Sequence, residues 1–142
     1  MKVFIACDHA AFDAKEAVKA ALAQGFELTD LGTHSTESVH YPEYAQLLAK
    51  AVLAAPGSRG ILLCGSGIGV SIAANRFKGI RAALCRDVDD AEMCRRHNDA
   101  NVLCLAGRKT AVTTIIEMAG KFLTTSFEGG RHQTRVEMIE NN

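Results

Sequence analysis

Residues 61–75 have the sequence ILLCGSGIGVSIAAN. Its four leading apolar residues predict a short buried strand. Three glycines at alternate positions then allow a tight turn and a close approach to a ligand, and the apolar run that follows predicts the start of a helix. Free backbone N–H groups at such a turn bind anions. The Cys64 thiol ends the strand beside them, and a proton acceptor next to N–H donors suits a reaction through an oxyanion.

Known glycine-loop patterns do not match this one. A dinucleotide fingerprint that starts at Gly65 requires glycine where Val70 stands. A cysteine phosphatase loop typically has arginine at that same position, and the Gly-Lys-Ser/Thr ending of a P-loop is absent. The simpler alternative is a strand–helix turn in which Cys64 is only a buried structural residue.

Composition narrows the class of protein. The chain has 142 residues, of which 48% are hydrophobic, so we expect one domain over residues 1–142. Sixteen basic residues balance sixteen acidic ones, which gives no reason to expect a nucleic acid or a membrane surface as partner. Five cysteines have no framework spacing and no apolar run approaches a membrane span, so we expect a reduced, cytoplasmic protein.

Strand and helix patterns alternate along the chain. Apolar runs predict strands at 2–7, 26–31, 61–64, 81–85 and 102–106. Helical spacing and caps predict helices at 12–24, 42–54, 68–74, 87–97 and 109–124, with a short helical piece that ends at 139. This alternation predicts an α/β fold of three layers, α/β/α, around a five-stranded parallel sheet.

Ligands bind at the carboxyl ends of strands in such sheets. The residues expected there are Asp8 and His9, Cys64 with Gly65 to Gly69, Arg86 and Asp87, and Gly107 and Arg108. The ends of the first, third and fifth strands together form the candidate site.

Several side chains near these ends could carry chemistry. The Ser66 hydroxyl could pass a proton between neighbouring oxygens, or simply cap the helix. His9 and His97 titrate near neutral pH, although each could equally be a surface or capping residue. Asn98 beside His97 strengthens the functional interpretation. Asp8 could hold sugar hydroxyls or only end its strand.

Arg131 and Arg135 lie four residues apart, so in a helical turn they would point the same way. With Arg108 they could form a clamp for phosphate or carboxylate, although a solvated basic face is the more common arrangement. Cys94 and His97 have the spacing of a metal pair, but no second pair accompanies them, so we expect no metal.

Six separated segments resemble type B ribose-5-phosphate isomerases, whose relatives act on galactose 6-phosphate and allose 6-phosphate. They are residues 7–10 (CDHA), 41–42 (YP), 64–75 (CGSGIGVSIAAN), 79–83 (GIRAA), 97–102 (HNDANV) and 129–135 (GGRHQTR). The similarity covers essentially the whole chain. It departs at Ala11, where many members have glycine, and at Ser66, which replaces a common threonine.

The resemblance implies an aldose–ketose isomerase with a Rossmann-like fold and without metal or organic cofactor. It also implies a homodimer or homotetramer whose active sites are shared between subunits. In this family Cys64 matches the base, Ser66 a hydroxyl that relays a proton and His97 the acid that opens the sugar ring. Matched substrate contacts are Asp8, His9, Tyr41, Gly65, Ser66, Gly67, Ile68, Gly69 and Asn98, and matched phosphate contacts are Arg108, Arg131 and Arg135.

We therefore expect interconversion of ribose 5-phosphate and ribulose 5-phosphate through a cis-enediolate. The alternatives are an isomerase of another aldose phosphate, including allose 6-phosphate, galactose 6-phosphate or a tetrose phosphate, and a sugar-phosphate-binding subunit without turnover.

Overall fold

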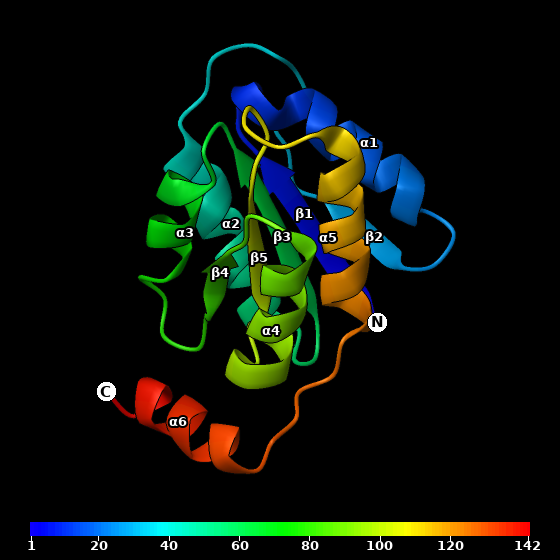
Figure 1. Cartoon of the computed structure of the whole chain (residues 1–142). Coiled ribbons are helices and arrows are strands. Elements are labelled where there is room, and N and C mark those ends of the chain that lie inside the picture. Colours follow the sequence, from blue (N-terminus) through cyan, green and yellow to red (C-terminus); the bar gives the residue numbers. More distant parts are fainter.

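The computed structural model describes residues 1–142 and contains one five-stranded sheet covered by helices on both faces (Figure 1). The strands are β1 (Lys2–Cys7), β2 (Glu27–Asp30), β3 (Arg59–Cys64), β4 (Ala82–Leu84) and β5 (Val102–Ala106). All of them are parallel, in the order β2-β1-β3-β5-β4. The predicted α/β architecture is confirmed.

The helices are α1 (Phe12–Leu22), α2 (Tyr41–Ala54), α3 (Ile68–Ala74), α4 (Val88–Asn98), α5 (Val112–Thr124) and α6 (Arg131–Glu140), with a short 3-10 turn η1 (His9–Ala11). The largest errors in the predicted boundaries concern two helices. Helix α5 starts three residues late, because Lys109 donates its N–H to Ala106 in a turn after β5. Helix α6 includes both Arg131 and Arg135, which the prediction placed before the helical piece. No helix has both the length and the apolar character needed to span a bilayer.

Alternate residues along the strands point to opposite faces of the sheet and pack into two separate cores. On one face Val3 and Ile5 of β1 pack among residues of α1, α4 and α5. On the other face Phe4 and Ala6 pack among residues of α2 and α3. A sheet buried on both faces explains why its central strands are almost wholly apolar.

Helix α6 lies outside these layers. Figure 1 shows it beyond the end of the sheet opposite the β3–α3 loop, and it contacts α4. Arg81, just before β4, pairs with Asp99 at 3.1 Å and with Glu140 at the end of α6. The pair with Glu140 holds α6 near the amino ends of the strands.

A buried lysine joins α1, β2 and the loop that follows β2. The Lys15 side chain is fully buried, and its Nζ donates to both carboxylate oxygens of Asp30 and to the Thr33 carbonyl, each at 2.7 Å. Burial raises the pKa of Asp30, but hydrogen bonds from Lys15 and Lys19 outweigh it and leave the pKa below its ordinary value. The ion pair therefore stabilises the folded chain as long as Asp30 is ionised.

Replacing Asp30 with a neutral residue should leave the buried Lys15 charge without its carboxylate partner. We expect Asp30→Asn to lower the free energy of unfolding by about 3–5 kcal/mol, measured by urea denaturation at neutral pH. Because the folded pKa of Asp30 is lowered, the wild-type advantage should persist above the ordinary carboxyl pKa and disappear as pH falls through the folded pKa. Glu27 is in the same strand as Asp30 and pairs with Lys2 of β1 at the surface, so Glu27→Gln should lower the free energy of unfolding by less than about 1 kcal/mol. Equal costs for the two variants would contradict this role of Lys15.

Candidate functional site

Strand β3 delivers Cys64 to the carboxyl edge of the sheet, where the glycine loop folds back over its sulfur. Cys64 is buried, and its Sγ accepts the backbone N–H of Gly67 at 3.1 Å. The loop is also joined to the end of β5, because Gly107 donates to the Cys64 carbonyl and Arg108 to the Gly65 carbonyl. The sulfur thus faces the loop amides, as the sequence predicted.

Two glycines are required by this geometry. Gly67 has a φ of +74°, and a Cβ there would lie 2.6 Å from Leu84 Cδ1 and 3.0 Å from the Leu105 carbonyl carbon. A Cβ on Gly69 would lie 2.6 Å from the Tyr41 ring. Gly67 therefore permits the turn, and Gly69 lets Tyr41 lie against the loop.

The loop amides divide into two groups. The Gly67 N–H donates to the Cys64 sulfur and the Ile68 N–H to Ser66 Oγ at 3.2 Å. The N–H groups of Gly65, Ser66 and Gly69 donate to no protein atom. These three are therefore available to bind a negatively charged oxygen. Ser66 accepts a local bond at the start of α3, which agrees with its alternative interpretation as a cap, while its own hydroxyl proton stays available.

Three further predicted residues gather at the same edge. Asp8 is buried and its carboxylate accepts the Ala10 N–H at 3.0 Å. His9 Nδ1 accepts the Val39 N–H at 3.1 Å, so its Nε2 is the nitrogen left for a ligand. The Arg108 side chain lies against Gly65, since a Cβ there would be 3.3 Å from Arg108 Cδ.

The remaining predicted residues lie at the opposite edge. His97 and Asn98 end α4, just before β5 begins, and the Asn98 carbonyl accepts from Arg81 Nε at the start of β4. Arg131 and Arg135 are exposed on α6. Within one chain, Arg108 therefore does not join the other two arginines, because helices return the chain to the amino ends of the strands. We call the first set the carboxyl half-site and the second the amino half-site.

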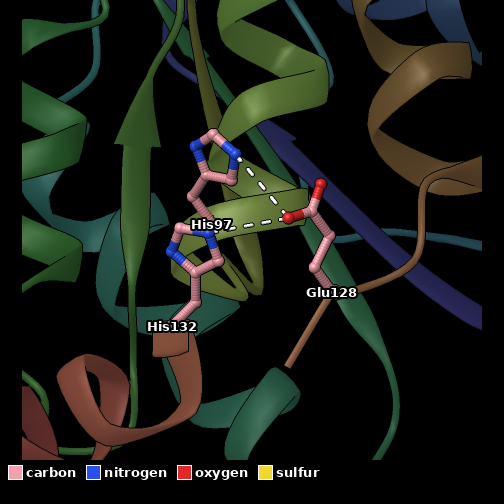
Figure 2. Close-up of side chains that lie close together, drawn as sticks. All are labelled: His97, Glu128 and His132. Atoms are coloured by element: carbon pink, nitrogen blue, oxygen red, sulfur yellow. Dashed lines mark ion pairs between the residues drawn. The ribbon is translucent and has the colours of Figure 1, made fainter. Parts of the chain in front are cut away.

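The amino half-site contains a histidine pair (Figure 2). The His97 and His132 rings stack with centroids 4.3 Å apart and planes 13° apart. Both Nε2 atoms face Glu128 Oε2, at 3.9 Å and 3.5 Å. Arg96 Nε donates to the other carboxylate oxygen of Glu128 at 2.6 Å.

Electrostatics distinguishes these groups. The hydrogen bond from Arg96 lowers the pKa of Glu128, so this carboxylate stays ionised. Burial, reinforced by the positive charge of His97 and Arg131, lowers the pKa of His132 and favours its neutral form. A neutral ring stacks on a second imidazole without charge repulsion.

Sequence reasoning gave no role to Glu128 or His132. Their only signal was their place beside the GGR segment, with His132 inside the 129–135 match. Together with His97 they form the one group whose ligand atoms, within 4.8 Å of one another, could hold a metal ion. The parallel rings and the Arg96 hydrogen bond favour an ion-pair cluster. Cys94 is not part of this group.

A cavity of about 520 Å³ lies at the amino edge and not at Cys64. It is lined by residues 75–83, Asn98, Ala100 and the end of α6.

Comparison with known proteins relates the chain to one group of enzymes. A sequence model of the family described as Ribose/Galactose Isomerase matches residues 3–139. The chain belongs to this family. It is 43% identical over 139 residues to ribose-5-phosphate isomerase B of Escherichia coli (strain K12), covering 97% of this chain and 93% of that one. It is therefore an aldose–ketose isomerase by class.

Solved structures agree with this membership of the isomerase family. A ribose 5-phosphate isomerase of Thermotoga maritima superposes with a TM-score of 0.96 at 48% identity, covering 99% of this chain and 98% of that one. Ribose-5-phosphate isomerase B of Mycoplasma genitalium, solved with bound ribulose-5-phosphate, has a TM-score of 0.94 at 38% identity, with coverages of 99% and 94%.

The loop geometry predicts a large difference between two glycine substitutions. Gly57→Ala also falls at positive φ but meets no atom within 4 Å, so it should cost only about 1–2 kcal/mol of stability. Gly67→Ala should cost about 1–3 kcal/mol more, because Leu84 and Leu105 must move. Chemical denaturation measures both. Equal costs would mean that the loop relaxes freely around position 67.

Proposed function

We propose that this isomerase interconverts ribose 5-phosphate and ribulose 5-phosphate, with Cys64 as the general base. The observation that carries the proposal is the Cys64 sulfur beside a loop with three unpaired amides. Family membership and the relatives named for ribose 5-phosphate support the substrate. The single domain expected from the sequence would contain both half-sites.

The chemistry follows from this arrangement. The Cys64 thiolate takes the proton from the carbon next to the carbonyl, and negative charge develops on the sugar oxygen. The amides of Gly65, Ser66 and Gly69 receive that oxygen, where each well-placed donor is worth roughly 3–4 kcal/mol in the transition state. Ser66 passes a proton between the two enediolate oxygens. Cys64 then returns its proton to the neighbouring carbon.

The other functions combine residues of both half-sites. His97 helps to open the furanose ring by proton transfer. Arg131 and Arg135, four residues apart on α6, hold the phosphate together with Arg108. Asp8, His9, Tyr41 and Asn98 contact the sugar. Glu128 and His132 position the His97 ring. Binding energy at the phosphate fixes the reacting carbons over Cys64.

The two half-sites join only if a second chain contributes one of them. In a two-fold dimer the carboxyl edge of one subunit meets the amino edge of the other, and the reciprocal contact builds a second identical site. Exposed apolar side chains support such a contact. Ile72 of α3 is 62% exposed, Met138 of α6 71% and Ile139 of α6 54%. Burying these apolar side chains at an interface would favour association of the two chains.

Another aldose phosphate is the alternative substrate, as the family's description includes galactose isomerases. Every proposed contact is to the phosphate, to the reacting carbons or to hydroxyls near them. The residues therefore do not exclude a sugar phosphate with one more carbon. Parallel assays with ribose 5-phosphate, allose 6-phosphate and galactose 6-phosphate separate the two possibilities. Conversion of only a hexose phosphate would reassign the substrate.

Removing the base should abolish turnover while substrate binding persists. We expect Cys64→Ala to lower kcat for ribose 5-phosphate by about 10²- to 10⁴-fold, measured as ketose formation in the presence of a chelator. Cys7→Ala is the matched control at the end of β1. Burial raises the pKa of the Cys7 thiol to about 12, so it is neutral and should be dispensable for turnover. Retained activity in Cys64→Ala would move the base elsewhere, and a need for added metal would point to the Glu128 cluster.

A mixing experiment tests the shared site. Cys64→Ala and His97→Asn should each be nearly inactive, but a fully exchanged equal mixture should recover about a quarter of wild-type activity, because each mixed dimer holds one intact site. Two variants of the same half-site, Cys64→Ala and Arg108→Ala, should not complement each other. Absence of recovery in the first mixture, with subunit exchange confirmed by mass, would contradict sharing.

A further inference from the structure

Two cysteines outside the candidate site touch each other. All five cysteines are free and buried, but only Cys85 and Cys94 form a sulfur–sulfur hydrogen bond, with 3.8 Å between their Sγ atoms. Cys85 directly follows β4, and Cys94 lies on α4, one turn before His97. Both belong to the core between the sheet and α1, α4 and α5. The proposed isomerase chemistry uses neither of them.

The two sulfurs lie near enough to form a bond after a small movement. A disulfide has its sulfurs about 2.05 Å apart, so the pair must approach by less than about 2 Å. Their local contacts do not hold them apart, since Cys85 otherwise reaches only the Ala83 carbonyl at 3.8 Å and Cys94 the Ala91 carbonyl at 3.4 Å. The approach requires changes in the side-chain torsions of the two cysteines.

The two thiols differ in chemical character. The hydrogen bond from Cys85, with help from the guanidinium groups of Arg95 and Arg59, lowers the pKa of Cys94. The same hydrogen bond and burial raise the pKa of Cys85. Cys94, which is 7% exposed, is therefore the thiol that reacts first as a nucleophile. Cys85, which is 2% exposed, is the thiol that then attacks the oxidised Cys94 sulfur.

We propose that Cys85 and Cys94 are a modification site that closes to a reversible intrachain disulfide when the protein meets a hydroperoxide. The Cys94 thiolate attacks one peroxide oxygen, the O–O bond breaks, and the departing oxygen takes up a proton. With hydrogen peroxide this gives a sulfenic acid and one water. The Cys85 sulfur then attacks the Cys94 sulfur, the S–O bond breaks, and the hydroxide leaves with the Cys85 proton as a second water. Two thiols lose two electrons, and the peroxide gains them.

The other cysteines are not equivalent. Burial raises the pKa of Cys7 to about 12 and also raises the pKa of Cys104. Cys64 has an N–H donor beside its sulfur but no cysteine partner. Oxidation of Cys64 therefore stops at the sulfenic acid or proceeds to higher acids. The bond at Cys85 and Cys94 would instead join the end of β4 to the helix that carries His97.

The test is peptide mapping of the natural, folded chain. The reduced protein is treated with limiting hydrogen peroxide, remaining thiols are alkylated, and the chain is digested with trypsin without reductant. Trypsin cuts after Arg81, Arg86 and Arg95, so the expected product is peptide 82–86 linked to peptide 87–95. Its mass is the sum of the two less two hydrogen atoms, and a thiol reductant separates it again.

Matched variants identify the order of attack. Cys85→Ser should lose the link and leave a sulfenic acid on Cys94 that a dimedone probe traps. Cys94→Ser should lose the link and leave Cys85 unmodified. Cys104→Ser, also buried, should keep the link. Absence of the linked 82–86 and 87–95 peptide after oxidation, or a link that joins other cysteines or forms only in urea, would overturn the proposal. None of these readouts depends on isomerase activity, so the two proposals fail separately.

Discussion

The hydrogen bond from the Gly67 N–H to the Cys64 sulfur organises the candidate site. It forms because β3 ends at Cys64 and the chain turns at once, so that Gly67, which is the third residue after Cys64 and has a left-handed conformation, lies over the sulfur. The same turn leaves the neighbouring N–H groups of Gly65, Ser66 and Gly69 without protein acceptors. A proton acceptor and a set of anion-binding donors thus result from one backbone conformation. Helix α3 has only seven residues, so these amides matter more than its dipole.

Backbone connections at both sides hold this loop in place. The turn after β5 donates to Cys64 and Gly65, and Leu105 lies against Gly67. Tyr41, at the start of α2, lies against Gly69. Elements far apart in the sequence therefore determine the position of the loop. Preorganised donors of this kind are effective because they need no reorganisation when charge develops.

The separation of the half-sites has a simple topological cause. In a parallel α/β sheet each helix returns the chain from the carboxyl edge to the amino edge. A residue at the end of α4 therefore lies far from the carboxyl ends of the strands. His97, Glu128 and His132 meet at the amino edge for this reason (Figure 2). Arg96 and Arg81 stabilise that region through ion pairs to Glu128 and Glu140.

The sequence by itself determined the layered fold, the order of its elements and the carboxyl half-site. Short apolar strands alternate with amphipathic helices, and glycines mark the turn after Cys64, so local rules were enough there. Only the tertiary structure decided that Lys15 is buried against Asp30, that Glu128 and His132 join His97, that Cys85 touches Cys94, and that Arg108 is apart from Arg131 and Arg135. These are contacts between side chains distant in sequence, and their spacing depends on how helices are placed across the sheet, which periodicity does not encode.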